Sequence, residues 1–275
     1  MFEARKIAGA LGAQIHGVDL KQPPSTATVD FLRAALLEHL VIFFREQHLT
    51  PAEFMRFAEA MGQPVEYPLL QGLPAFPKII QVMKLEHERH NFGGIWHSDT
   101  AYLERPPMGS MLLAQEVPAA GGDTLFANQY LAYETLSPGM QRLLQPLIAV
   151  NSSSKADATK TREDRMRSDK RADARDEYVA EHAVVRTHPE TGRKALYVNV
   201  AHTVRFKDMS EEESQPLLAY LFQHQTRPEF TCRFRWEAGS LAFWDNRCAQ
   251  HNPINDYHGY RRVMLRITLA GGKPR

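Results

Sequence analysis

The chain has 275 residues, of which 43% are hydrophobic and 24% are charged, with a formal net charge of +1. This balance argues against a general binder of nucleic acid or of membrane surfaces, because neither sign of charge is in excess. The longest apolar run is far too short to cross a bilayer, and no secretory signal is visible. The two cysteines fit no zinc motif or disulfide framework, so we expect a reduced, cytoplasmic protein.

The N-terminal part of the chain mixes strand and helix signals. Residues 40–44 are all apolar and predict a buried strand. Thr50 and Glu53 form a capping box with a proline between them, which predicts a helix that ends at Gly62. A second capping box, at Ser210 and Glu213, predicts another helix later in the chain.

Residues 151–181 differ from the rest of the chain, because they are rich in charge and serine and poor in aromatic residues. One interpretation is a solvated loop or surface helix. The other is a lid-like insertion that covers a site, since long insertions in compact domains often do so. The two interpretations are compatible.

Short segments rich in β-branched and aromatic residues follow from residue 183 onward. They predict strands at residues 195–198, 230–236, 241–244 and 262–269. Several strands at this spacing suggest a β-sandwich or barrel-like core. Helices do not alternate regularly with the strands, so a parallel βαβ sheet fits poorly. We therefore expect a mainly β fold with flanking helices.

The two faces of the last predicted strand differ in chemistry. With a period of two, one face is purely aliphatic and should pack in the core. The other face carries Arg262, Met264, Arg266 and Thr268. It could be an ordinary solvated face, or it could look into a cavity that holds anions. Guanidinium groups can each fork onto a carboxylate or sulfonate, and burying them without such a partner is costly.

Three residues could form a metal site. His97-Ser-Asp99 is the only His-x-Asp in the chain, and an extended strand would place both donors on the same side. A similar-looking motif at His188 lies in a turn, and we interpret it as structural. His251 follows a predicted strand and precedes the arginine-bearing strand by a short turn, so it could join a site that Arg262 also faces.

The ligand types in this group limit the metal. Two imidazoles and one carboxylate leave three positions open on an octahedral ion, which suits Fe(II) with a chelating co-substrate and O2. Zinc would accept the same ligand types, but it usually sits in a tetrahedral site with one water. Spacing alone leaves both metals open.

Several ordered motifs resemble one family. They are Trp96-His-Ser-Asp99, Gly121-Gly-Asp-Thr124, Phe243-Trp-Asp-Asn-Arg247, His251 and Arg261-Arg262. Together they resemble the TauD/TfdA family of taurine dioxygenase-like, Fe(II)- and 2-oxoglutarate-dependent enzymes. The resemblance runs over almost the whole chain. It implies a single domain over residues 1–275 with a double-stranded β-helix, or jelly roll, and flanking helices.

The resemblance also implies roles for individual residues. The implied iron ligands are His97, Asp99 and His251. Thr124 matches a threonine that contacts 2-oxoglutarate, and Arg262 matches the arginine that pairs with its far carboxylate. Arg266 matches an arginine that meets the substrate anion or supports the co-substrate carboxylate. The implied reaction is hydroxylation by O2 coupled to decarboxylation of 2-oxoglutarate to succinate, with C–S or C–O cleavage when the hydroxylated carbon bears the heteroatom.

The positions that would recognise taurine depart from the family pattern. Tyr67 and Gly93 stand near the places of taurine-contacting residues, and His202 falls where a pocket aromatic is expected. We therefore expect a small anionic substrate other than taurine, such as another sulfonate, an alkyl sulfate or an aryloxy acid. Tyr67, Tyr102, His202 and Arg266 are the candidate substrate residues.

Other properties follow from the resemblance. A homo-oligomer, dimeric or tetrameric, is expected, with a small-molecule substrate and no nucleic-acid or membrane partner. Two alternatives remain open: a jelly-roll metalloprotein of another class, such as a zinc or manganese hydrolase or isomerase, and a non-catalytic binding protein with the same fold.

Overall fold

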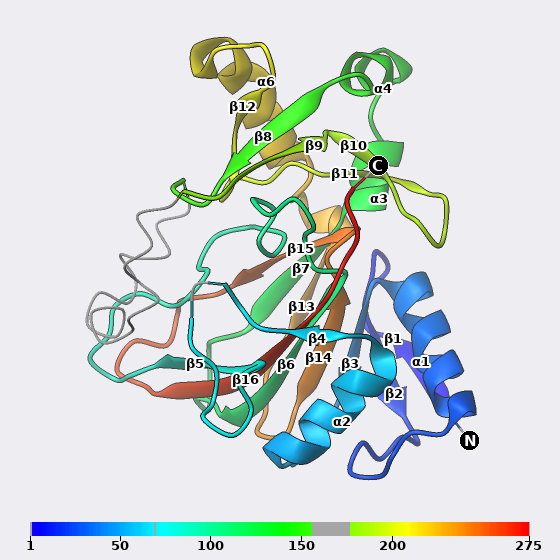
Figure 1. Ribbon diagram of the computed structural model, residues 1–275, viewed down its shortest axis with the longest axis vertical. Helices are drawn as coiled ribbons and strands as arrows, with labels where there is room; N and C mark the ends of the chain where they lie inside the picture. The colour runs from blue at the N-terminus through cyan, green and yellow to red at the C-terminus, as the bar shows by residue number, and fades with distance from the viewer. Residues whose placement is uncertain (1, 69, 156–176, 275) are drawn as a thin grey trace.

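The computed structural model describes residues 2–68, 70–155 and 177–274 (Figure 1). Its centre is a large, mostly antiparallel sheet. The strand order is β1 (Glu3–Lys6), β2 (Ala13–His16), β3 (Val41–Phe44), β14 (Leu241–Asp245), β6 (Gly109–Glu116), β16 (Arg262–Leu269) and β4 (Pro64–Val65). β5 (Ile79–Lys84) also pairs with β16, along the same edge as β4. β16 therefore lies between β6 and the two edge strands, where both of its faces are buried.

A smaller sheet packs against this large sheet. Its strand order is β13 (Thr231–Phe234), β7 (Thr124–Asn128) and β15 (Ala249–Pro253). Aromatic rings pack between the two layers. Phe43 of β3 stacks on Phe234 with ring centroids 4.1 Å apart, and Phe43 and Phe126 form an edge-type pair with ring centroids 5.5 Å apart. Two antiparallel sheets with an apolar layer between them form the predicted jelly roll.

Two helices cover the other face of the large sheet (Figure 1). They are α1 (Thr26–His39) and α2 (Pro51–Met61). Leu32 and Phe57 from these helices belong to the same apolar cluster as Leu265 and Ile267 of β16. The aliphatic face of β16 thus packs in the core, as its period-two pattern predicts. The capping box at Thr50 is formed, with Gly62 as the C-cap of α2.

The remaining elements form a separate layer at the top of Figure 1. Its strands are β12 (Thr203–Phe206), β8 (Ile148–Ser152) and β9 (Val179–Ala183), with the hairpin β10 (Val185–Thr187) and β11 (Lys194–Leu196). Its helices are α3 (Gln129–Glu134), α4 (Pro138–Leu144), α6 (Glu211–His224) and the 3-10 helix η2 (Pro228–Phe230). A third apolar cluster, which includes Leu144, Phe206 and Leu218, holds this layer together.

The expected lid-like insertion at residues 151–181 falls mostly outside the described residues, since only its two ends are included. These ends belong to β8 and β9, which pair antiparallel. Several predicted strand boundaries are wrong. Leu40 is not in a strand but is the C-cap of α1, with a φ of 65°. The strand predicted over 195–198 ends at Leu196, and in the strand predicted over 230–236 only Thr231–Phe234 is extended, with Phe230 in η2. Within the described part of the chain, no helix is long and apolar enough to span a membrane.

Candidate active site

His97, Asp99 and His251 come together between the two sheets. The backbones of His97 and His251 form an isolated antiparallel bridge, with reciprocal N–H to carbonyl hydrogen bonds of 3.0 and 2.9 Å. Asp99 Oδ1 lies 3.5 Å from His97 Nε2 and 3.8 Å from His251 Nε2. All three side chains are buried, and one potential ligand atom from each lies within 4.8 Å of the others.

The local backbone differs from the expected one. His97-Ser-Asp99 does not form a regular strand: His97 makes the single bridge, and Asp99 lies in the turn that follows. His251 follows the strand over 241–245, as expected, but it lies in the middle of a further strand, β15, that was not predicted. The three side chains converge because β15 pairs with β7 on one side and bridges to His97 on the other.

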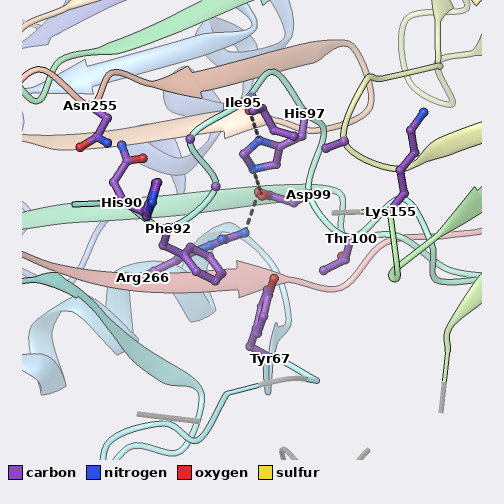
Figure 2. A pocket seen from close by; sticks show the side chains of 14 residues that line it. Tyr67, His90, Phe92, Ile95, His97, Asp99, Thr100, Lys155, Asn255 and Arg266 are labelled. Carbon is purple, nitrogen blue, oxygen red and sulfur yellow. Dashed lines mark hydrogen bonds and ion pairs between the residues drawn. The ribbon is translucent and has the colours of Figure 1, made fainter. Parts of the chain in front are cut away.

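The protonation of the group suits a metal ion. His97 Nδ1 lies 2.7 Å from the carbonyl oxygen of Ile95, so Nδ1 carries the proton and Nε2 presents a lone pair (Figure 2). Burial lowers the pKa of His251 well below its ordinary value, which keeps that imidazole neutral. Burial is the largest single effect on Asp99 and opposes its ionisation, but Arg266 and the two histidines together outweigh it and lower the pKa of the carboxyl well below its usual range. Two neutral imidazoles and one carboxylate are the donor set that a divalent ion accepts.

Two cavities border this group: His97 lines both, Asp99 lines the larger one and His251 lines the smaller one. The larger cavity has a volume of about 370 Å³ and is lined by residues that include Tyr67, Phe92, Ile95, Thr100 and Ala201 (Figure 2). The smaller cavity lies between the sheets and is lined by residues that include Thr124, Trp236, His251 and Arg262. Phe92, His97 and Arg266 line both cavities. The two cavities therefore adjoin beside the group of potential metal ligands.

The smaller cavity contains an unsatisfied cation. Arg262 is 5% exposed, and its Nε and Nη2 atoms have no hydrogen-bond partner among the described residues. Burial lowers the pKa of Arg262, and its guanidinium lies 5.6 Å from the centre of the Trp236 ring. Trp236 Nε1 in turn donates to Thr124 Oγ1 at 3.0 Å. A buried guanidinium without an acceptor is unfavourable, so these residues fit a ligand that brings a carboxylate.

Arg266 lies at the junction of the two cavities. Its Nη2 is 2.7 Å from Asp99 Oδ2, and its guanidinium carbon is 5.2 Å from the centre of the Tyr67 ring. Its Nε is buried and has no hydrogen-bond partner in the described part of the chain. Nη2 of this guanidinium is thus held by Asp99, whereas Nε keeps an N–H that could donate to a bound ligand.

The remaining candidate substrate residues differ in position. Tyr67 lines the larger cavity, whereas Tyr102 and His202 are not among its lining residues. The Tyr102 ring lies 5.0 Å from that of His202, and the His202 ring lies 6.1 Å from that of His97. Burial lowers the pKa of His202 to about 3. His202 therefore packs against His97, and Tyr102 packs against His202. Contact of either side chain with a substrate stays a prediction.

Sequence reasoning missed three polar features of the site. Lys155 and Asn255 line the larger cavity, and Ser110 contacts Asp99 inside the large sheet. A serine directly before the apolar run of residues 111–114 was the available signal for Ser110. Gly93, with a φ of 70°, lies so close to the metal group that a Cβ there would be 3.0 Å from His97 Cε1. A sequence pattern does not reveal such a contact.

A second group of potential ligands, His188, Asp245 and Cys248, is a structural network. His188 Nδ1 accepts from the backbone N–H groups of Glu190 and Thr191, so Nε2 carries the proton and donates to Asp245 Oδ2 at 3.1 Å. Arg247 donates to both oxygens of Asp245, at 2.8 and 2.6 Å. Since these groups already satisfy one another, the interpretation of the His188 motif as structural agrees with the geometry.

Comparison with known proteins identifies the family. Residues 3–268 match the family model described as taurine catabolism dioxygenase TauD, TfdA family. The chain belongs to the TauD/TfdA family. Its enzyme class, cofactors and fold agree with the sequence-based expectations: TauD/TfdA members are jelly-roll dioxygenases that use Fe(II), 2-oxoglutarate and O2.

Two curated relatives in the TauD/TfdA family are similar over nearly the whole chain. An alpha-ketoglutarate-dependent sulfate ester dioxygenase from Pseudomonas putida is 39% identical, with 99% of this chain and 91% of that protein covered. An alkylsulfatase from Acinetobacter baylyi is 36% identical, with 98% and 85% covered. The crystal structure of a taurine dioxygenase from Burkholderia xenovorans has a TM-score of 0.85 and 34% identity, and covers 99% of this chain and 90% of that one.

Proposed function

We propose that this chain is an Fe(II)- and 2-oxoglutarate-dependent dioxygenase that hydroxylates a small anionic substrate, with an alkyl sulfate ester as the preferred class. The observation that carries this proposal is the buried Arg262, whose Nε and Nη2 have no hydrogen-bond partner among the described residues, beside a group of two histidines and one carboxylate. A hydrolase needs no second cavity with a buried guanidinium, whereas a dicarboxylate co-substrate does.

Each residue has a specific part in this proposal. His97, Asp99 and His251 hold Fe(II), which when bound activates O2 for hydroxylation coupled to oxidation of 2-oxoglutarate to succinate and CO2. Arg262 pairs with the far carboxylate of 2-oxoglutarate, with Thr124 beside it in the same cavity. The position of Arg266 in both cavities supports a shared role toward the co-substrate and the substrate anion.

The larger cavity supports a substrate with an apolar chain and an anionic end. Phe92, Ile95 and Ala201 line it with apolar surface, while Arg266 supplies a cation next to Asp99. Gly93 presents no side chain for binding a polar amine. The sulfate ester dioxygenase and the alkylsulfatase among the relatives support the same class. Hydroxylation of the carbon that bears the sulfate would release the sulfate and leave an aldehyde.

The proposal also covers assembly and location. We propose a homo-oligomer, dimeric or tetrameric, supported by the family resemblance, and light scattering would test it. We propose a cytoplasmic location, which is supported by two buried cysteines that are both free thiols. Fractionation of cells would test the location.

The function is tested by titrating the anaerobic Fe(II)·2-oxoglutarate complex with alkyl sulfates, sulfonates and aryloxy acids. We expect alkyl sulfates to shift the visible charge-transfer band at the lowest concentrations, and to give succinate and sulfate in equal amounts once O2 is added. Sulfate release that needs no 2-oxoglutarate would instead indicate a hydrolase. Absence of succinate with every substrate class would overturn the dioxygenase assignment.

A further inference from the structure

The two oxygens of Asp99 have different environments. Oδ1 faces the Nε2 atoms of both histidines, at 3.5 and 3.8 Å. Oδ2 points away from them and receives two donors: Ser110 Oγ at 2.7 Å and Arg266 Nη2 at 2.7 Å. The two oxygens of this carboxylate therefore differ in role: Oδ1 is available to a metal, whereas Oδ2 is held by Ser110 and Arg266.

The direction of the Ser110 hydrogen bond follows from its neighbours. Ser110 is fully buried, and its Oγ lies 3.0 Å from Asn246 Nδ2 and 3.4 Å from Arg266 Nη2. Both of these nitrogens can only donate. The single hydroxyl hydrogen of Ser110 must therefore point to Asp99 Oδ2, since no other acceptor competes for it among these contacts.

The orientation of the Asn246 amide is fixed in the same way. Its Oδ1 accepts from Trp244 Nε1 at 2.9 Å and from the backbone N–H of Asp99 at 3.4 Å. Its Nδ2 is thereby directed to Ser110. A chain of three hydrogen bonds thus runs from Trp244 through Asn246 and Ser110 to Asp99, with every donor pointing toward Oδ2. Such aligned chains strengthen each bond in a buried environment.

The large sheet holds this chain rigidly. Ser110 lies on β6, the strand between β14 and β16, and pairs with Trp244 on one side and with Thr268 on the other. The backbone N–H of Asn246 donates to the carbonyl of Met108 at 2.9 Å. The two donors to Asp99 Oδ2 thus come from adjacent strands, Ser110 from β6 and Arg266 from β16, and Asn246 directly follows β14. Asp99 itself lies in a turn outside the sheet.

We propose that Ser110 and Asn246 are positioning residues that fix Asp99 as a one-oxygen metal ligand. This inference rests on the proposed function, because it assumes a metal at the His97, Asp99 and His251 group. By occupying Oδ2, the hydrogen-bond chain prevents the carboxylate from turning to bind the metal through both oxygens. It thereby preserves coordination positions for the co-substrate and O2.

The test uses Co(II), whose visible absorption reports the number and arrangement of its ligands. Ser110→Ala removes the donor, Ser110→Thr retains a hydroxyl, and Ser214→Ala removes a fully buried serine hydroxyl in α6, away from the site. We expect Ser110→Ala to weaken Co(II) binding by roughly 10- to 100-fold and to change the band in position and intensity. Ser110→Thr and Ser214→Ala should keep the wild-type spectrum.

The outcomes separate the inference from the function on which it rests. A folded Ser110→Ala variant with wild-type Co(II) affinity and spectrum overturns the inference. If Ser110→Ala does not fold, Ser110→Cys, which keeps a side chain of similar size but is a weak donor, decides by the same band. A wild-type protein that neither binds Co(II) nor forms succinate would instead overturn the proposed function.

Discussion

Arg266 Nη2 lies 2.7 Å from Asp99 Oδ2, in a pair in which both side chains are buried. Asp99 belongs to the group of potential metal ligands, and Arg266 lines both cavities, so this pair connects the ligand group with the place where the cavities adjoin. Removing one partner leaves the other as an unpaired buried charge, which costs far more than an exposed ion pair contributes.

Replacing Arg266 should therefore destabilise the metal-free protein. We expect Arg266→Met to lower the free energy of unfolding by about 3 kcal/mol, because Asp99 loses its buried counter-charge. Urea denaturation in the presence of a chelator measures this. The double variant Asp99→Ala/Arg266→Met should recover part of the loss. If the two single effects simply add, the pair is not coupled.

Arg262 should act on the co-substrate alone. Arg262→Gln removes the charge for the far carboxylate, and we expect the KM for 2-oxoglutarate to rise by roughly 10- to 100-fold, from a lost charged hydrogen bond. Co(II) affinity should be unchanged. Arg261→Gln is the matched control, because Arg261 is the exposed neighbour, paired only loosely with Glu116 at 3.4 Å. Succinate formation at varied 2-oxoglutarate measures the effect, and equal KM values for both variants would contradict the assignment.

A side chain at Gly93 should displace His97. The Cβ of Gly93→Ala would lie 3.0 Å from His97 Cε1, so the ring must shift away from the added methyl group and out of its present position. We expect Co(II) affinity to fall roughly tenfold or more, by analogy with the loss of other groups that orient a ligand. Gly192→Ala is the control, because Gly192 has the same φ of 70° with nothing within 4 Å of the added Cβ. Equal effects of the two changes on metal affinity would show that backbone strain, and not contact with His97, is responsible.

The Asp245 network predicts a loss of stability in acid. Burial opposes ionisation of Asp245, but Arg247 and His188 outweigh it and lower the pKa of the carboxyl to about 2. Because the folded pKa is depressed, the stabilisation is complete above the ordinary pKa of 3.8 and is lost as the pH falls from there through 2. The shift corresponds to about 2 kcal/mol.

Thermal unfolding of wild type and Asp245→Asn between pH 5 and pH 2 measures this contribution. The difference in stability between the two proteins should be constant at the upper end and shrink toward pH 2. A difference that stays constant over the whole range would show that Asp245 does not titrate with this depressed pKa.

Local periodicity predicted the parts of the site that lie on regular strands. The alternation along residues 262–269 placed Arg262 and Arg266 on one face because β16 is a regular strand over the same residues. The cleft they face could not be derived from that strand alone, since it is formed by β7, β15 and the segment around Phe92. The TauD/TfdA motifs, in their order along the chain, predicted the dioxygenase chemistry, and the match to the family model over residues 3–268 agrees with that prediction.

Other features depend on contacts that no local pattern contains. His97 was expected in a strand, but a single bridge to His251 orients it, and the bridge depends on a partner far along the chain. No predicted element covered Ser110, and only the fold brings its hydroxyl within 2.7 Å of Asp99 Oδ2. Tyr102 and His202 were candidate substrate residues, and their aromatic character is also explained by packing, since His202 lies against His97 and Tyr102 against His202.

The bridge between His97 and His251 has a consequence for biosynthesis. More than half of this sequence separates these two residues. During translation, the second imidazole can therefore meet the first only long after His97 has been synthesised. A nascent chain that already carries His97 and Asp99 offers only a partial ligand set, so the complete iron site can form only once His251 has also left the ribosome.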